Sequence, residues 1–270
     1  LKMADKENEI HSNKWLEKWG REARLRMSPS QREQWDKHYD PIIKKFKEDK
    51  LTGKALAEWK YQRYMHDYMR VIHSVDRNVG RVIDYLRKHN LLDNTLIVYT
   101  SDQGFYMGEH GWFDKRFMYE ESFRTPLLIY MPGGKRGDIA EMVQNIDYAP
   151  TFLQLAGVQV PKDIQGVSML PLLKGKRVPW RKSLYYHYYE FPDEHNVCRH
   201  YGVKDQRYVL IHFYDDIDAW ELYDLKTDPS QLNNIYGKPG TETITRNLKK
   251  ELLRLQEQYN VPIRHKMVKE

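Results

Sequence analysis

The sequence predicts an α/β domain followed by a smaller α+β domain with an antiparallel sheet and a terminal helix. From Ala55 to His89 apolar residues recur at spacings of three and four, which indicates a helix packed on a core. A short connection leads to Thr95–Thr100, an apolar β-branched segment typical of a strand buried on both faces. A helix followed by a buried strand is the alternation of elements typical of an α/β sheet.

Composition excludes several classes of protein. Hydrophobic residues make up 40% of the 270 residues and aromatic residues 13%, enough for a core, which excludes a disordered chain. No apolar run approaches the ~18 residues of a membrane span, which excludes an integral membrane protein. The net charge of +6 favours acidic ligands without choosing among them. The single cysteine, Cys198, excludes an intrachain disulfide and a thiolate metal cage.

The first part of the chain, residues 1–54, is polar and is expected to form a helical insertion. Ser30, followed three residues later by Glu33, predicts a helix start with a capping box. Asp40-Pro41 and Thr52-Gly53 are expected to break the pattern, so residues 4–50 should form two or three surface helices.

The later elements are predicted from short apolar runs and from the prolines and glycines that separate them. Pro126–Met131 is a second strand, and Asp147–Ala156 is a helix with Pro150 in its first turn. Proline and glycine mark residues 161–180 as a linker. In residues 181–270, alternating aromatic segments predict antiparallel strands over 183–190, 208–214 and 220–225, before a last helix over about 241–259.

The segment from Thr100 to Arg116 is the densest in chemistry. Ligands of open α/β sheets bind beyond the carboxyl ends of strands, where Asp102 and Gln103 stand. A carboxylate beside an amide oxygen offers hard ligands suited to calcium or magnesium. The glycines that follow let the chain turn and bring His110 and Lys115 back over the strand end. A polar, glycine-rich loop with an Asp-led turn explains the same residues without a site.

A family resemblance adds to these observations. The chain resembles the C-terminal part of a type I (formylglycine-dependent) sulfatase of the alkaline-phosphatase-like superfamily, most of all sulfatases of glycans such as N-acetylglucosamine-6-sulfatases. The motifs that carry it are Ser74-Val-Asp-Arg-Asn-Val-Gly80, Thr100-Ser-Asp-Gln-Gly104, Gly108-Glu-His-Gly111, Asp114-Lys-Arg116, Tyr119-Glu-Glu-Ser122 and Arg124-Thr-Pro-Leu127. The resemblance implies that residues 55–160 are the end of an alkaline-phosphatase-like sandwich, and that residues 181–270 are its C-terminal α+β subdomain.

The resemblance also implies roles. Asp102 and Gln103 would supply two ligands of a single calcium ion, and Lys115 would contact a sulfate oxygen and the bridging oxygen. His110 would be a second donor in the same loop, with a structural role as the alternative. In the C-terminal subdomain, His195, Arg199 and His200 would bind the sulfated carbohydrate, with a solvated loop as the alternative.

One motif of such sulfatases is not found in the chain. The nucleophile is made from the Cys or Ser of a C-x-(P/A)-S-R motif, and Cys198 does not lie in one. The resemblance therefore implies the C-terminal portion of a longer enzyme, inactive by itself, whose N-terminal part holds the nucleophile and the remaining calcium ligands. It also implies a periplasmic, secreted or lysosomal location.

Two other functions remain open. One is a phosphatase or phosphodiesterase of the same superfamily, although a zinc-using relative should show extra histidines where Gln103 stands. The other is a polyanion-binding module driven by the positive charge, ranked last because no DNA-reading motif is evident. Two local readings favour structure: Tyr185–Tyr189 as a strand rather than a sugar platform, and Asp215–Asp218 as a hairpin turn rather than a calcium loop.

Overall fold

The structure is a computed structural model that describes residues 22–192, 195, 197–215, 217–262 and 267. The chain divides into two packing units, one of residues 1–88 with 106–113 and one of residues 89–105 with 114–270. None of the helices in the described ranges is long and apolar enough to cross a bilayer. The predicted division into four segments was drawn on other boundaries and stays a prediction.

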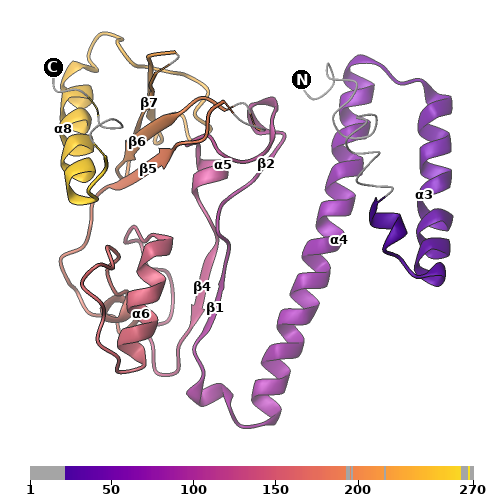
Figure 1. Ribbon diagram of the computed structural model, residues 1–270, viewed down its shortest axis with the longest axis horizontal. Coiled ribbons are helices and arrows are strands. Elements are labelled where there is room, and N and C mark those ends of the chain that lie inside the picture. Colours follow the sequence, from indigo (N-terminus) through magenta and orange to yellow (C-terminus); the bar gives the residue numbers. More distant parts are fainter. Residues whose placement is uncertain (1–21, 193–194, 196, 216, 263–266, 268–270) are drawn as a thin grey trace. The chain divides into compact units, whose positions relative to one another are not determined.

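The first unit is a helical hairpin with a small loop segment. Helix α3 (Pro29–Asp49) lies along the first half of α4 (Gly53–Lys88) (Figure 1). The two helices are held by Phe46 stacked on Trp59, with ring centroids 4.1 Å apart, and by a 3.0 Å hydrogen bond from Tyr39 to Asp67. The loop segment contains β2 (Tyr106–Met107), a 3₁₀ turn η2 (Glu109–Gly111) and the start of β3 (Phe113–Asp114).

The start and course of α3 differ from the prediction. Ser28, not Ser30, is the N-cap, and it forms a capping box with Gln31 in place of Glu33. Proline is favoured at the first helical position because its missing N–H is unneeded there, so Pro29 sets the start. Pro41 lies inside the helix and does not end it. The helix continues across it, since α3 packs along α4 on both sides of this position.

Helix α4 has the predicted bounds within about two residues, but its apolar stripe is not packed as predicted. Its buried residues lie near its N-terminus, from Leu56 to Arg63. Farther on, Met69, Val75 and Val82 are exposed. The apolar stripe is present in the sequence, but no described residue of this unit packs against this part of it.

The second unit begins with a 3₁₀ turn, η1 (Leu92–Asn94), and a two-stranded antiparallel ribbon of β1 (Ile97–Thr100) and β4 (Leu127–Tyr130). Both strands were predicted, but β1 is half-buried and Tyr99 and Leu128 are exposed. The expected burial on both faces needs further strands and covering layers, and among the described residues no further strand pairs with either edge of this ribbon. Helix α5 (Glu120–Phe123) lies between β3 and β4 in the chain.

Helix α6 (Tyr148–Leu155) follows η3 (Asn145–Asp147), as predicted from Asp147 and Pro150. The Asp147 carboxylate is fully buried and pairs with the two terminal guanidinium nitrogens of Arg181, Nη1 and Nη2. It also accepts hydrogen bonds from the backbone N–H groups of Gln144 and Val167, each 2.8 Å long. One buried charge thus joins three segments of the chain, and it is compensated by several donors. The short helix α7 (Leu170–Leu173) follows.

A four-stranded antiparallel meander ends the chain, in the order β5 (Leu184–Tyr188), β6 (His200–Lys204), β7 (Tyr208–Phe213) and β8 (Ala219–Asp224). Helix α8 (Glu242–Gln258) covers one face (Figure 1). Leu248, Leu252 and Leu255 of α8 pack on Val203, Leu210 and Leu222 of the sheet. Strand β6 was not predicted.

Candidate functional site

The turn after β1 takes Asp102 and Gln103 out of strand geometry. Ser101 Oγ donates to Asp102 Oδ1 at 3.3 Å and to the backbone oxygen of Gln103 at 2.8 Å. The Gln103 N–H also donates to Asp102 Oδ1, at 3.1 Å. Neighbouring residues of a regular strand point to opposite faces, so this turn is what allows both side chains to serve one site.

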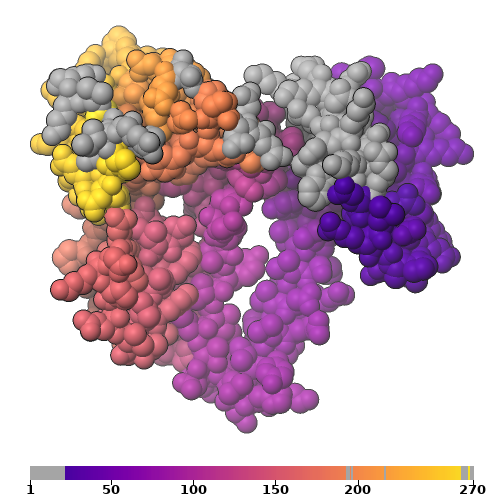
Figure 2. Space-filling view, in the orientation of Figure 1, coloured from indigo at the N-terminus to yellow at the C-terminus, as the bar shows by residue number. Residues whose placement is uncertain are grey.

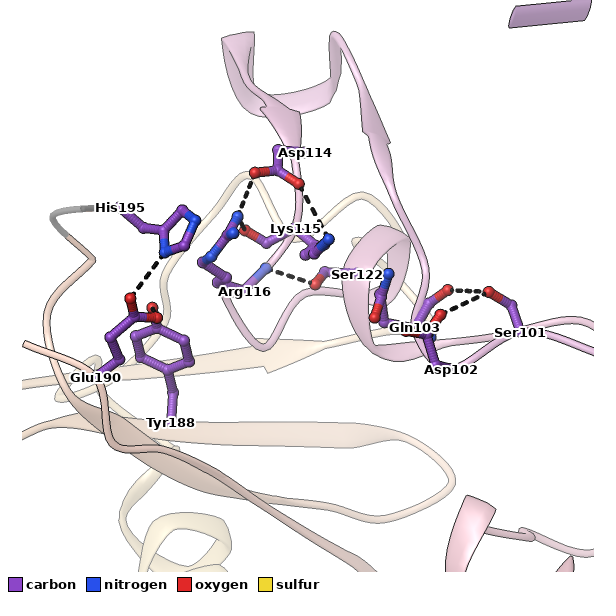
Figure 3. Close-up of polar contacts among 10 residues, drawn as sticks. All are labelled: Ser101, Asp102, Gln103, Asp114, Lys115, Arg116, Ser122, Tyr188, Glu190 and His195. Atoms are coloured by element: carbon purple, nitrogen blue, oxygen red, sulfur yellow. Dashed lines mark hydrogen bonds and ion pairs between the residues drawn. The ribbon is translucent and has the colours of Figure 1, made fainter. Parts of the chain in front are cut away.

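Ser122 of α5 connects this turn to the loop that carries Lys115 (Figure 3). Its backbone oxygen accepts a 2.8 Å hydrogen bond from the Gly104 N–H. Its Oγ accepts a 2.9 Å hydrogen bond from the Arg116 N–H. Ser122 is buried, and a Cβ on Gly104 would lie 2.0 Å from the Glu121 oxygen. The approach of these segments therefore requires glycine at position 104.

Lys115 stands between two residues with strained backbone. Asp114 has φ 79° and Arg116 has φ 119°, backbone angles that residues other than glycine seldom adopt. The Asp114 carboxylate pairs with Arg116 and lies 3.6 Å from Lys115 Nζ. Arg116 is mostly buried, whereas the Lys115 side chain is 35% exposed. The loop thus fixes Arg116 and leaves the Lys115 ammonium accessible.

His200 lies behind Arg116 and does not reach the surface. It is fully buried, and its ring stacks on Phe117, Tyr186 and Tyr188. Its Nδ1 is 2.8 Å from the Cys198 oxygen. Burial lowers the pKa of His200 to about 4, so its imidazole is neutral at pH 7. In this arrangement the ring is enclosed by aromatic side chains next to Arg116, and its predicted role in binding the carbohydrate stays a prediction.

His195 and Arg199 lie in the connection between β5 and β6. His195 Nδ1 is 2.9 Å from Glu190 Oε1. The Arg199 guanidinium donates to the backbone oxygens of Tyr189 and Phe191 and to Asp215. Arg199 thus braces this connection with its donors. His195 lies on the Arg116 side of it (Figure 3).

His110 lies in η2, within the first packing unit. It has φ 55°, and its ring stacks on Trp112 at 5.6 Å and meets Tyr106 edge to face at 5.9 Å. These contacts give it a structural role within its own loop. Its predicted role as a second donor is not tested by them.

The residues after β1 fit a hard cation only in part. Asp102 offers a carboxylate and Gln103 an amide oxygen, the ligand types that calcium and magnesium prefer. Calcium takes about six to eight oxygens, so two residues cannot form a complete site. Across the described residues, no group of three or more His, Cys, Asp or Glu could hold a metal ion.

A cavity of about 1490 Å³ opens beside the Asp102 turn, within the second unit. Asp102, Gln103 and Arg124 line one part of it, and Tyr186 and Lys204 of the sheet line another. Figure 2 shows the molecule hollowed between the C-terminal sheet and the segment that holds α6. The cavity borders the candidate site.

Several of these groups had no role in the sequence analysis. Asp114 and Arg116 were noted only as members of a family motif, although two opposite charges on either side of Lys115 are a readable signal. Ser122 gives no local signal, because its function depends on two segments that return to it. Glu190 was seen only as the end of a strand.

Comparison with known proteins identifies the family. A family model described as N-sulphoglucosamine sulphohydrolase, C-terminal, matches residues 108–258. One described as Sulfatase matches residues 17–158. The chain is 52% identical over 239 residues to an N-acetylglucosamine-6-O-sulfatase of Bacteroides thetaiotaomicron, covering 87% of this chain and 43% of that protein. It is 32% identical over 238 residues to the multifunctional alkaline phosphatase superfamily protein PehA of Trinickia caryophylli, covering 80% and 45%.

Solved structures show the same likeness. A structure described as bound to its substrate D-glucosamine-2-N,6-O-disulfate matches with a TM-score of 0.84 and 50% identity, over 88% of this chain and 49% of that one. A phosphonate monoester hydrolase of Agrobacterium radiobacter matches with a TM-score of 0.62 and 27% identity, over 70% and 40%. The predicted alkaline-phosphatase-like α/β fold is confirmed by these neighbours. The chain spans less than half the length of the curated relatives named above. Two family models, each matching more than half of the sequence, and a relative at 52% identity show that the chain belongs to the sulfatase family.

Proposed function

We propose that this chain forms the C-terminal part of a sulfatase that hydrolyses sulfate esters on an amino sugar of the glycosaminoglycan type. Its first candidate substrate is 6-O-sulfated N-acetylglucosamine, because a relative at 52% identity is described as an N-acetylglucosamine-6-O-sulfatase. A solved structure at 50% identity is described as bound to another 6-O-sulfated glucosamine, D-glucosamine-2-N,6-O-disulfate. The observation that carries the proposal is the pair of hydrogen bonds that Ser122 accepts, one at its backbone oxygen from Gly104 and one at its hydroxyl from Arg116. It holds the turn of Asp102 beside the loop of Lys115.

Lys115 is the proposed catalytic cation. Its ammonium would contact a non-bridging sulfate oxygen and the bridging oxygen, where negative charge grows as the alcohol leaves. A compact ammonium suits this role, since it can follow the developing charge as a point charge. The partial exposure of Lys115 and the fixed positions of Asp114 and Arg116 support this assignment. His110 is proposed as a second donor on the strength of the family resemblance alone.

Asp102 and Gln103 are the proposed ligands of one calcium ion. The carboxylate oxygen of Asp102 that accepts from Ser101 is already oriented by that contact, and the turn frees both side chains from strand geometry. Bound calcium would supply positive charge to the sulfate oxygens. The oxygen-only pair favours calcium over zinc.

The remainder of the protein is the proposed partner of this chain. It would supply the nucleophile and the remaining calcium ligands, as the relatives' greater length permits. The exposed ribbon and the cavity beside Asp102 support such a partner, because both present surface that a longer sheet would cover. The proposed location is the periplasm, the outside of the cell or the lysosome.

The C-terminal sheet is proposed to select the sugar. His195 is the group that a sugar would contact, and Arg199 would hold the connection that presents it. His200 would act from behind, by supporting the Arg116 segment. The +6 charge of the chain agrees with an anionic substrate.

The test uses the full-length protein and three esters with the same leaving group, a sulfate, a phosphate monoester and a phosphonate monoester. Lys115→Ala should lower sulfate-ester kcat/KM by about 100-fold or more, as loss of an electrostatic stabiliser commonly does. Lys226→Ala removes an exposed cation elsewhere in the second unit and should leave kcat/KM unchanged. Near-normal turnover by the Lys115 variant would remove it from the site. A preference for either phosphorus ester would favour the phosphatase or phosphodiesterase alternative.

A further inference from the structure

Glu190 makes two side-chain hydrogen bonds, although it is partly exposed. It lies just after β5, where its Oε2 accepts a 2.6 Å hydrogen bond from Tyr188 Oη and its Oε1 lies 2.9 Å from His195 Nδ1. Its side chain and that of His195 are each 34% exposed. Each carboxylate oxygen of Glu190 thus has a side-chain hydrogen-bond partner, although the side chain is partly exposed and could be solvated by water instead.

The pair is electrostatically connected to the Lys115 loop. The Tyr188 and His195 hydrogen bonds lower the pKa of Glu190, and the positive charge of Arg116 adds to them. Arg116 also acts on the Tyr188 hydroxyl. Figure 3 shows Glu190 and His195 on the Arg116 side of the loop that carries Lys115. The carboxylate therefore remains ionised while it faces the cationic part of the candidate site.

An ionised carboxylate beside Nδ1 decides where the proton of a neutral imidazole lies. The carboxylate can only accept, so Nδ1 must donate, and the proton of neutral His195 is placed there. The Nε2 atom is then an acceptor. Within the described part of the chain, no group forms a hydrogen bond with Nε2, so it is open to a ligand that donates.

We propose that Glu190 is a positioning residue that holds His195 in the Nδ1–H tautomer, so that Nε2 accepts a hydrogen bond from a sugar hydroxyl. Tyr188 holds the other oxygen of Glu190 and fixes the direction of the carboxylate. The ligand class is a sulfated sugar with a free hydroxyl near the ester. This inference rests on the proposed sulfatase function, since the sulfate of that sugar would lie at Lys115.

The first experiment measures kinetics of the full-length enzyme on 6-O-sulfated N-acetylglucosamine and on 4-nitrophenyl sulfate, which carries no sugar hydroxyl. Glu190→Gln keeps the size of the side chain but can turn an amide N–H toward Nδ1. It should raise KM for the sugar sulfate by about tenfold, the worth of one hydrogen bond, with a smaller change in kcat. Kinetics on the aryl sulfate should stay within about twofold, since no contact of that ester depends on His195.

Tyr188→Phe and Glu242→Gln complete the series. Tyr188→Phe removes only the second support, so its KM should lie between those of the wild type and Glu190→Gln. Glu242→Gln changes an exposed carboxylate at the start of α8 and should match the wild type. If Glu190→Gln lost the same activity on both esters, the substitution would have damaged the site in general. If it lost activity on neither ester, Glu190 would only support the loop. Either result overturns the inference.

A second experiment does not depend on turnover. Long-range ¹H–¹⁵N correlation NMR of the full-length protein reports which ring nitrogen of His195 carries the proton. The wild type should show Nδ1–H, and Glu190→Gln should shift the proton toward Nε2. Nε2–H in the wild type would overturn the positioning role. Nδ1–H in a protein that hydrolyses no sulfate ester would instead refute the proposed function and leave the tautomer assignment standing.

Discussion

Asp114 and Arg116 store backbone strain on either side of Lys115. Residues in sparsely populated conformations cost on the order of 1–3 kcal/mol each and persist only where their surroundings fix them. Here the surroundings are the Asp114–Arg116 ion pair and the Ser122 hydroxyl that accepts from the Arg116 N–H. The position of the Lys115 ammonium is therefore decided by its neighbours and by a helix that follows it in the chain.

Gly104→Ala should displace the Asp102 turn. The new Cβ would lie 2.0 Å from the Glu121 oxygen, so the turn must move away from α5 and lose its bond to Ser122. We expect at least tenfold weaker calcium binding by the full-length protein, measured by calorimetry, because misplaced ligands commonly cost about 10–100-fold in metal affinity. Gly80→Ala is the matched control: no atom lies within 4 Å of its added Cβ. Unchanged calcium affinity in Gly104→Ala would contradict the placement of this turn.

His200 should make stability pH-dependent in mildly acidic solution. Its pKa is lowered from 6.5 to about 4 by burial, so below pH 6.5 the unfolded chain binds a proton that the folded chain refuses. Stability is therefore fully present above pH 6.5 and falls as the pH drops toward 4, by up to about 3 kcal/mol from this group. Burial also lowers the pKa of His212, which acts in the same direction.

Urea unfolding at several pH values would measure this slope. His200→Phe keeps an aromatic ring in the stack and should flatten the pH dependence, leaving the part due to His212. His73→Phe, at an exposed position of α4, should leave the slope unchanged. An unaltered slope in the His200 variant would show that another group carries the effect.

At the scale of elements, α8 and its sheet share a hydrophobic core within the second unit. Leu252→Ala should destabilise the chain by about 2–5 kcal/mol, because it opens a cavity in a fully buried contact with the sheet. Leu253→Ala makes the same change on a half-buried face and should cost clearly less. Denaturant midpoints with equal slopes would compare them, and equal losses would contradict the observed face of α8.

The sequence predicted the elements whose signals are local. The helix α4, the strand β1 and the helix α8 were each predicted, because hydrophobic periodicity follows directly from the geometry of helices and strands. The burial predicted for the α4 stripe and for both faces of β1 was not found. Strand β6 was missed because His200-Tyr-Gly-Val-Lys204 carries a histidine and a glycine where a strand pattern needs apolar residues. Gly202 is required there: a Cβ would lie 2.4 Å from Met118 Sδ and 2.5 Å from the Leu210 oxygen. That requirement exists only in the folded sheet.

The candidate site rests on predictions of the same local kind. Asp102, Gln103 and Lys115 were selected by their strand-end position and the family motif, and their roles stay predictions. The burial of His200 and the brace formed by Arg199 depend on contacts with distant strands and backbone oxygens. Residue type alone cannot separate a histidine that meets a ligand from one enclosed by aromatic rings.

At the scale of the whole molecule, the ribbon of β1 and β4 should behave differently in the isolated chain and in the full-length protein. An isolated two-stranded ribbon is marginal in water, and Leu128 is 62% exposed. Leu128→Thr should change the stability of the isolated chain by less than about 0.5 kcal/mol, as a surface substitution does. In the full-length protein it should cost about 2 kcal/mol or more, because the side chain would be covered there.

Leu232→Thr is the control for this comparison. Leu232 is 72% exposed and follows β8 in the chain, outside both strands of the ribbon. It should be nearly neutral in both proteins. Thermal unfolding of the four variants would decide the matter, and a Leu128 variant that is equally tolerated in both contexts would contradict the proposed covering of the ribbon.

The buried Asp147 carboxylate also affects how the second unit should respond to a protease. The stretch around Lys162 is exposed, so trypsin can reach a bond there. On either side of that bond, Gln144 precedes the cut and Val167 and Arg181 follow it, and all three donate to the same carboxylate. The Thr151 hydroxyl adds a further link, a 2.8 Å bond from the Met169 N–H. A nicked molecule would therefore run as two fragments on a denaturing gel while remaining one particle in solution.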